Sequence, residues 1–94
     1  MIRYGVIGCG MMGQQHLRNI NLINVAIAYA IYEPNINMLK MAKKLAPDAK
    51  FYDSLDKNLS DENIDCWLIV SPNHLHMEQL EQLAGIPHRP ILVE

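Results

Sequence analysis

A glycine-rich segment directly follows an apolar stretch near the start of the chain, and this pairing constrains the fold more than any other feature. The apolar stretch covers residues 4–7, and the next six residues read Gly-Cys-Gly-Met-Met-Gly, with glycines at positions 8, 10 and 13. Between a strand and a helix, this spacing is typical of loops that hold a pyrophosphate at one edge of a parallel sheet. Glu33 follows at the spacing expected of a ribose ligand.

Apolar periodicity predicts strands that alternate with helices. We expect strands at residues 2–7, 25–32, 50–52, 66–70 and 91–93, and helices at residues 12–22, 55–59 and 75–84. A further helix opens at Pro34 and Asn35 and ends at Pro47, with Met38, Ala42 and Leu45 along its apolar face. The strands at 25–32 and 66–70 are apolar throughout, which is typical of strands covered on both faces. The fold class is therefore α/β, a doubly wound parallel sheet of about five strands in the order 3-2-1-4-5. The crevice for a ligand lies between the first and fourth strands.

Composition narrows the class of protein. The 94 residues make one domain, residues 1–94. The net charge is −2 and the basic residues are scattered, so the sequence does not predict a nucleic-acid-binding surface. No apolar run approaches the length of about 20 residues that a membrane span needs. The first strand begins at residue 2, which leaves no room for a signal peptide. Cys9 and Cys66 form no Cys-x-x-Cys pair, so we expect a cytoplasmic protein.

Each position of the glycine loop has a separate role. Gly8 permits the tight turn, Gly10 lets the backbone approach phosphate oxygens, and Gly13 lets the helix pack close to the sheet. The amides of Met11 and Met12 face the pyrophosphate at the helix N-terminus. The alternative interpretation is a glycine-rich turn that serves packing alone.

Glu33 ends the second predicted strand, where a carboxylate accepts hydrogen bonds from both hydroxyls of an adenine ribose. The same charge repels a 2′-phosphate, and Pro34 and Asn35 follow instead of an arginine. We therefore expect NAD as the cofactor in preference to NADP. The alternative is that Glu33 is a surface acid at the start of a helix.

A third candidate segment, residues 71–76, reads Ser-Pro-Asn-His-Leu-His and follows the fourth strand on the other side of the crevice. Asn73 is suited to cap the next helix, and His76 lies where it can reach the ribose or nicotinamide. A zinc site with Cys66 is disfavoured, because Cys66 begins the strand about 16 Å from the histidines. We assign no metal ligand and no catalytic residue.

Four segments, GVIGCGMMGQQHL, IYEPN, IDCWLIVSPNHLH and ILVE, resemble the N-terminal domain of the glucose–fructose oxidoreductase / inositol dehydrogenase family over essentially the whole chain. The resemblance implies a Rossmann-type domain that binds NAD(P). It carries over a set of cofactor contacts, namely Gly8, Gly10, Met11, Met12, Gly13, Glu33, Ser71, Pro72, Asn73 and His76.

In that family the fifth strand ends in Glu-Lys-Pro, and Glu94 resembles the first residue of this motif. We therefore expect a partial domain that lacks the sixth strand, the lysine and the C-terminal substrate domain. The resemblance implies that the full-length parent takes a small polyol or sugar as substrate. We also expect that parent to be a homo-oligomer, and the present chain alone to be inactive.

Three functions remain open from the sequence. The leading one is the NAD(P)-binding part of an oxidoreductase that transfers hydride between nicotinamide and a sugar, cyclitol or related polyol. A non-catalytic nucleotide-sensing module shares the loop and the acid, but is not expected to carry Pro-Asn-x-x-His. A methyltransferase that binds S-adenosylmethionine is a third, against which the third glycine argues.

Overall fold

The chain folds around one parallel sheet of five strands in the order β3-β2-β1-β4-β5. This arrangement is seen in a computed structural model, which describes residues 1–71, 75, 79 and 90–93. The strands are β1 (Ile2–Ile7), β2 (Ala26–Tyr32), β3 (Lys50–Tyr52), β4 (Cys66–Ile69) and β5 (Ile91–Val93). The predicted fold class and strand order are confirmed.

Three helices connect the first four strands. They are α1 (Met11–Asn21), α2 (Ile36–Leu45) and α3 (Leu55–Leu59). Asn35 caps α2 by accepting a hydrogen bond from the N–H of Met38, and Ser54 caps α3 in the same way from Lys57. The predicted bounds of α3 are confirmed, and those of α1 are each one residue too late. Gly10 is the residue that precedes α1, and Leu22 follows its end.

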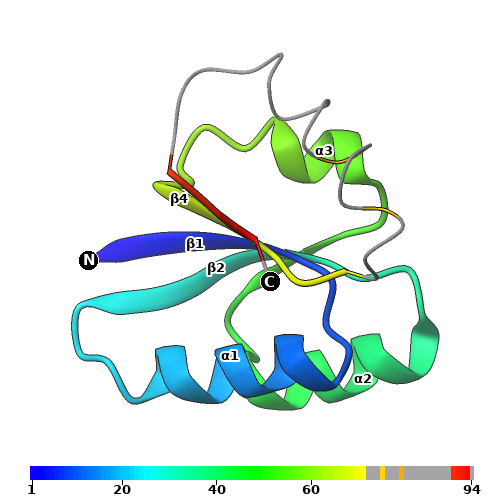
Figure 1. The fold of residues 1–94 in the computed structure, drawn as a ribbon, viewed down its shortest axis with the longest axis horizontal. Coiled ribbons are helices and arrows are strands. Elements are labelled where there is room, and N and C mark those ends of the chain that lie inside the picture. The colour runs from blue at the N-terminus through cyan, green and yellow to red at the C-terminus, as the bar shows by residue number, and fades with distance from the viewer. Residues whose placement is uncertain (72–74, 76–78, 80–89, 94) are drawn as a thin grey trace.

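The sheet separates two layers of helix, with α1 and α2 on one face and α3 on the other (Figure 1). On the side of α1 and α2, Val6, Leu17, Ile31, Ala42 and Leu68 belong to one buried apolar cluster. On the other side, Ile7, Leu59, Ile64, Trp67 and Ile69 form a second. Because strand side chains alternate between faces, the continuous apolar runs of β1 and β4 supply both clusters.

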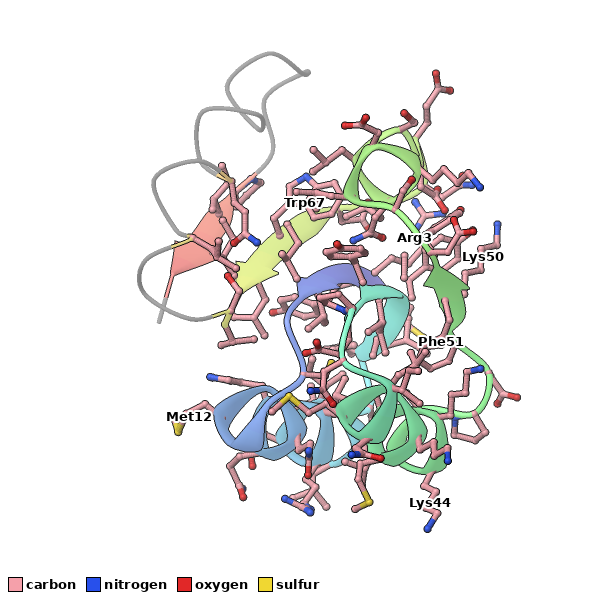
Figure 2. The ribbon with its side chains drawn as sticks, turned by 90° about the vertical axis from the view of Figure 1, so that its right-hand side faces the viewer. Arg3, Met12, Lys44, Lys50, Phe51 and Trp67 are labelled. Carbon is pink, nitrogen blue, oxygen red and sulfur yellow. The ribbon has the colours of Figure 1, made fainter. Side chains whose placement is uncertain are left out.

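Trp67 lies on the α3 side of the sheet (Figure 2) and is 1% exposed. Its ring occupies the space above Gly5, the partner of Trp67 across the β1–β4 pair. A β-carbon on Gly5 would lie 2.6 Å from the Trp67 ring and 2.9 Å from Ile64. Gly5 thus leaves room for the largest side chain of this cluster against the centre of the sheet.

Three sequence predictions need correction at the ends of elements. Val25 was expected inside a covered strand, but β2 begins at Ala26 and Val25 is 60% exposed. Val25 still accepts a hydrogen bond from the N–H of Ile2 through its carbonyl, at 2.6 Å, so it flanks the ladder without being covered. Val70 was expected in β4, which ends at Ile69. Met38 was expected on the buried face of α2, but it is 39% exposed.

The predicted helix at residues 75–84 lies outside the described residues apart from Leu75 and Gln79. Among the residues that the structure does describe, no helix has the length and apolar character needed to cross a membrane.

Candidate dinucleotide-binding site

The glycine loop leaves the sheet at a sharp turn centred on Gly8. Gly8 has a φ of 96°, a conformation that residues with a side chain rarely adopt. A β-carbon at this position would also lie 2.6 Å from the backbone nitrogen of Ser71. The tight turn predicted for Gly8 is therefore confirmed, and it brings the end of β1 against the end of β4.

The other two glycines differ in their surroundings. A β-carbon on Gly13 would lie 2.5 Å from the carbonyl oxygen of Gly8, so the close approach of α1 to the loop requires glycine there. A β-carbon on Gly10 would meet only the side chain of Met38, no nearer than 3.8 Å. The space beside Gly10 is thus bordered only by the Met38 side chain at ordinary contact distance, which fits a loop whose backbone must be approached by a ligand.

Helix α1 begins with backbone N–H groups directed along its axis. Its first intrahelical hydrogen bond runs from the N–H of Gln14 to the carbonyl of Gly10, at 2.9 Å. The N–H groups of residues 11–13 precede that bond, as in the first turn of any helix. Together with the helix dipole they form an electropositive end suited to an anion. Met12 points outward from this turn (Figure 2) and is 55% exposed.

Glu33 follows β2 and reaches back to the glycine loop. Its Oε1 accepts a hydrogen bond from the N–H of Cys9 at 2.6 Å, and its Oε2 accepts one from the N–H of Asn35 at 2.9 Å. The residue is only 9% exposed. The alternative of a surface acid is therefore wrong, because the carboxylate is buried against the loop.

The Cys9 side chain points into the interior and is fully buried. Burial, together with the nearby charge of Glu33, raises the pKa of its thiol to about 12. The thiol therefore stays protonated at neutral pH and is a poor nucleophile. Cys9 contributes its backbone N–H to the site and its side chain to the core.

Ser71 follows β4, and its backbone lies next to Gly8. Its hydroxyl donates a hydrogen bond to Oε1 of Gln79, and both side chains are buried. The remaining residues predicted from this segment, Pro72, Asn73 and His76, lie outside the described residues.

Sequence reasoning missed three members of this region. The sequence indicates Asn35 only as the start of a helix, but its N–H also donates a hydrogen bond to Glu33. Met38 is predicted on the apolar face of the helix with Ala42 and Leu45, but its side chain lies beside Gly10. Gln79 carried no signal beyond a helical position, although its partner Ser71 was predicted.

No group of three or more His, Cys, Asp or Glu side chains able to hold a metal ion occurs within the described part of the chain. Cys66 begins β4, at the opposite end of that strand from the crevice.

Comparison with known proteins connects this geometry to a family. A family model described as an oxidoreductase family with an NAD-binding Rossmann fold matches residues 2–94. Myo-inositol 2-dehydrogenase from Thermotoga maritima is 34% identical over 77 residues, covering 82% of this chain and 23% of that protein. 2,7-anhydro-N-acetylneuraminate hydratase from Escherichia coli is 33% identical over 84 residues, covering 89% of this chain and 22% of that protein.

A solved structure agrees in fold. The WlbA dehydrogenase from Bordetella pertussis, crystallised with NADH and UDP-GlcNAcA, is 27% identical to this chain and superposes with a TM-score of 0.84. The match covers 98% of this chain and 26% of that one. This chain thus spans about a quarter of the length of the proteins that it matches.

Proposed function

Because the chain belongs to the oxidoreductase family with an NAD-binding Rossmann fold, we propose that it binds NAD in the crevice between β1 and β4. The observation that carries this proposal is the contact between the loop and the acid. The Glu33 carboxylate lies 2.6 Å from the N–H of Cys9, inside the glycine loop. A diphosphate site and a ribose site therefore adjoin each other, as an adenine dinucleotide requires.

The proposed contacts follow the chemistry of each group. Backbone N–H groups of the loop and of the first turn of α1 receive the pyrophosphate beside Gly10, where a β-carbon would meet only the Met38 side chain. Glu33 accepts hydrogen bonds from the ribose hydroxyls, and Ser71 borders the crevice on the β4 side. The proposed contact residues are Gly8, Gly10, Met11, Met12, Gly13, Glu33 and Ser71, with Pro72, Asn73 and His76 as further predictions.

We propose NAD in preference to NADP because Glu33 puts a fixed negative charge where a 2′-phosphate would stand. At a separation of about 4 Å, repulsion between two unit charges costs about 1 to 4 kcal/mol, depending on the local dielectric. Pro34 and Asn35 follow Glu33, so no guanidinium from these two positions offsets that repulsion.

For the whole protein we propose hydride transfer between nicotinamide and a sugar, cyclitol or related polyol. NAD supplies the hydride acceptor or donor when bound. The relatives named above are enzymes, one of them a cyclitol dehydrogenase, which supports this over a nucleotide-sensing module. The hydratase among them favours a second candidate, in which the same nucleotide domain serves an enzyme acting on a sugar without net oxidation.

The proposal also covers domain organisation and location. We propose that residues 1–94 are the nucleotide-binding part of a longer, homo-oligomeric enzyme, whose polyol-binding residues lie in other parts of that protein. The free thiols of Cys9 and Cys66 support a reducing, cytoplasmic compartment.

Isothermal titration calorimetry of the chain with NAD, NADP and ADP-ribose tests the proposal. We expect NAD and ADP-ribose to bind with similar affinity, and NADP at least about fivefold more weakly. Equal or tighter binding of NADP would refute the preference, and the absence of binding by all three would refute the site.

A further inference from the structure

Glu33 does more in this structure than face a ligand. Both of its carboxylate oxygens accept hydrogen bonds from the chain itself, from Cys9 N at 2.6 Å and from Asn35 N at 2.9 Å. An ionised carboxylate can accept about four hydrogen bonds. Two acceptor positions therefore remain for ribose hydroxyls while the other two join separate segments of backbone.

The connection continues into α2. The Oδ1 atom of Asn35 accepts a hydrogen bond from the N–H of Met38 at 3.1 Å. The Met38 thioether in turn lies 3.8 Å from the position of a β-carbon on Gly10. Glu33 and Asn35 thus link the glycine loop to the start of α2 through hydrogen bonds, and the Met38 side chain flanks the space beside Gly10.

The loop gains from such a connection because its glycines have little intrinsic preference for one backbone conformation. Two of the three residues between β1 and α1 are glycines, Gly8 and Gly10, which lose the most backbone freedom on ordering. Gly8 N donates to the carbonyl of Tyr32 at 2.9 Å, and the bond from Cys9 N to Glu33 is the next one along. The buried Cys9 amide would lack an acceptor without that carboxylate.

We propose that Glu33 is a positioning residue, which holds the glycine loop in its binding conformation before any dinucleotide arrives, with the N–H of Asn35 fixing the orientation of the carboxylate. This inference rests on the proposed function only for its effect on NAD affinity. A site ordered in advance binds more tightly because less conformational freedom is lost on binding. It also keeps the charge of Glu33 in place, so the carboxylate does not swing aside to admit a 2′-phosphate.

Substitutions at two positions test this role. Glu33→Gln leaves one carbonyl acceptor and turns an amide donor toward the other backbone N–H, so one of the two bonds is lost. Asn35→Pro removes the N–H that binds Glu33 together with the helix cap, and the φ of −80° at Asn35 suits proline. Asn35→Ala is its matched control, because it removes the cap and keeps the N–H. Asp48→Asn, which neutralises an exposed carboxylate in the turn before β3, is the control for the loss of one negative charge.

The measurement is amide hydrogen exchange by NMR on the chain without nucleotide. We expect exchange at Cys9 and Gly10 to be roughly 10- to 100-fold faster in Glu33→Gln than in the unchanged chain, with exchange at Val6 and Ile31 unaltered. Amide exchange at Cys9 should also be faster in Asn35→Pro than in Asn35→Ala, and Asp48→Asn should leave the exchange at Cys9 unchanged. If Glu33→Gln does not fold, the comparison of Asn35→Pro with Asn35→Ala tests the positioning role by itself.

Calorimetry with NAD separates the two claims. We expect Asn35→Pro to bind NAD about tenfold more weakly than Asn35→Ala. Unchanged exchange at Cys9 in Glu33→Gln, or equal exchange in the two Asn35 variants, would overturn the positioning role even where NAD binds. Faster exchange at Cys9 in a chain that fails to bind NAD would support the positioning role and refute the proposed function.

Discussion

A β-carbon on Gly13 would lie 2.5 Å from the carbonyl oxygen of Gly8, so α1 and the end of β1 approach as closely as glycine permits. Gly13→Ala must displace backbone atoms, because the obstacle is a carbonyl rather than a flexible side chain. Alanine favours a helix by about 1 kcal/mol, but overpacking of this kind costs about 1 to 3 kcal/mol. We expect a net decrease of up to about 2 kcal/mol in the free energy of unfolding, measured in urea.

Gly10→Ala is the matched control for that experiment, because its β-carbon would meet only the side chain of Met38 at ordinary contact distance. Its free energy of unfolding should stay within about 1 kcal/mol of the unchanged chain, the usual cost of alanine at the residue before a helix. Its NAD affinity should fall at least about tenfold, because the added methyl group occupies the space proposed for phosphate. Unaltered NAD binding in Gly10→Ala would contradict the role given to this position.

The side-chain amide of Asn58 is buried. The residue lies in α3 with no exposed surface, and among the residues that the structure describes neither its Oδ1 nor its Nδ2 has a hydrogen-bond partner. A buried polar group without a partner costs about 1 to 3 kcal/mol. We expect Asn58→Leu, which keeps the branched shape, to raise the free energy of unfolding by about 1 kcal/mol. A lower melting temperature for this variant would show that the amide is satisfied in the native protein.

The buried carboxylate of Asp61 makes part of the stability depend on pH. Burial acts to raise the pKa of Asp61, but hydrogen bonds from Tyr52 and from the N–H of Asn63, with the charge of Lys50, lower it overall. A lowered folded pKa stabilises the protein above the unfolded value of about 4, and this contribution is lost as pH falls through the folded pKa. Tyr52→Phe, which removes a bond of 2.7 Å, should cost about 1 kcal/mol at pH 7.

That difference between Tyr52→Phe and the unchanged chain should begin to shrink as the pH falls below about 4, and it should be lost as the pH falls through the lowered folded pKa of Asp61, where the carboxyl group becomes protonated in both proteins. Urea unfolding across this pH range measures it. Tyr4→Phe, on the opposite face of the sheet, serves as the control and should show no such dependence. A difference that persists undiminished in acid would mean that Asp61 does not carry the effect.

The two cysteines should differ in reactivity. Burial and the charge of Glu33 raise the pKa of Cys9 to about 12, and the side chain has no exposed surface. Burial and Asp65 also raise the pKa of Cys66, which is only partly buried. With iodoacetamide at about pH 8, we expect Cys66 to be alkylated first and Cys9 only after unfolding in urea, as followed by mass spectrometry. Rapid labelling of native Cys9 would contradict the buried loop.

Much of the fold could be predicted because short apolar runs indicate the strands and helices, and glycine and proline indicate where they end. The bounds of β1, β3 and β5 follow from short apolar segments, and the strand order follows from the right-handed connection of parallel strands. The wrong predictions concern residues whose burial depends on contacts with other helices, strands or loops. Val25 stands beyond the covered part of β2, and Met38 lies at the first turn of α2, beside the glycine loop.

The part of the site that a local sequence pattern encodes could also be predicted. Gly8 and Gly13 are required by backbone geometry that recurs wherever such a loop forms, and the pattern carries that requirement. The bonds from Cys9 and Asn35 to Glu33 could not be predicted, because they depend on how two turns meet in space. Nothing in the residues flanking Glu33 distinguishes a buried acid from an exposed one.

The central claim is that the amides after β1 receive a diphosphate while Glu33 binds the adjoining ribose. Titration of the ¹⁵N-labelled chain with NAD, followed by amide chemical shifts, tests it most directly. The account predicts that the largest shifts fall on residues 8–13 and on Asn35, with saturation at a single Kd. Shifts confined to other surfaces, or no shifts at any NAD concentration, would contradict it.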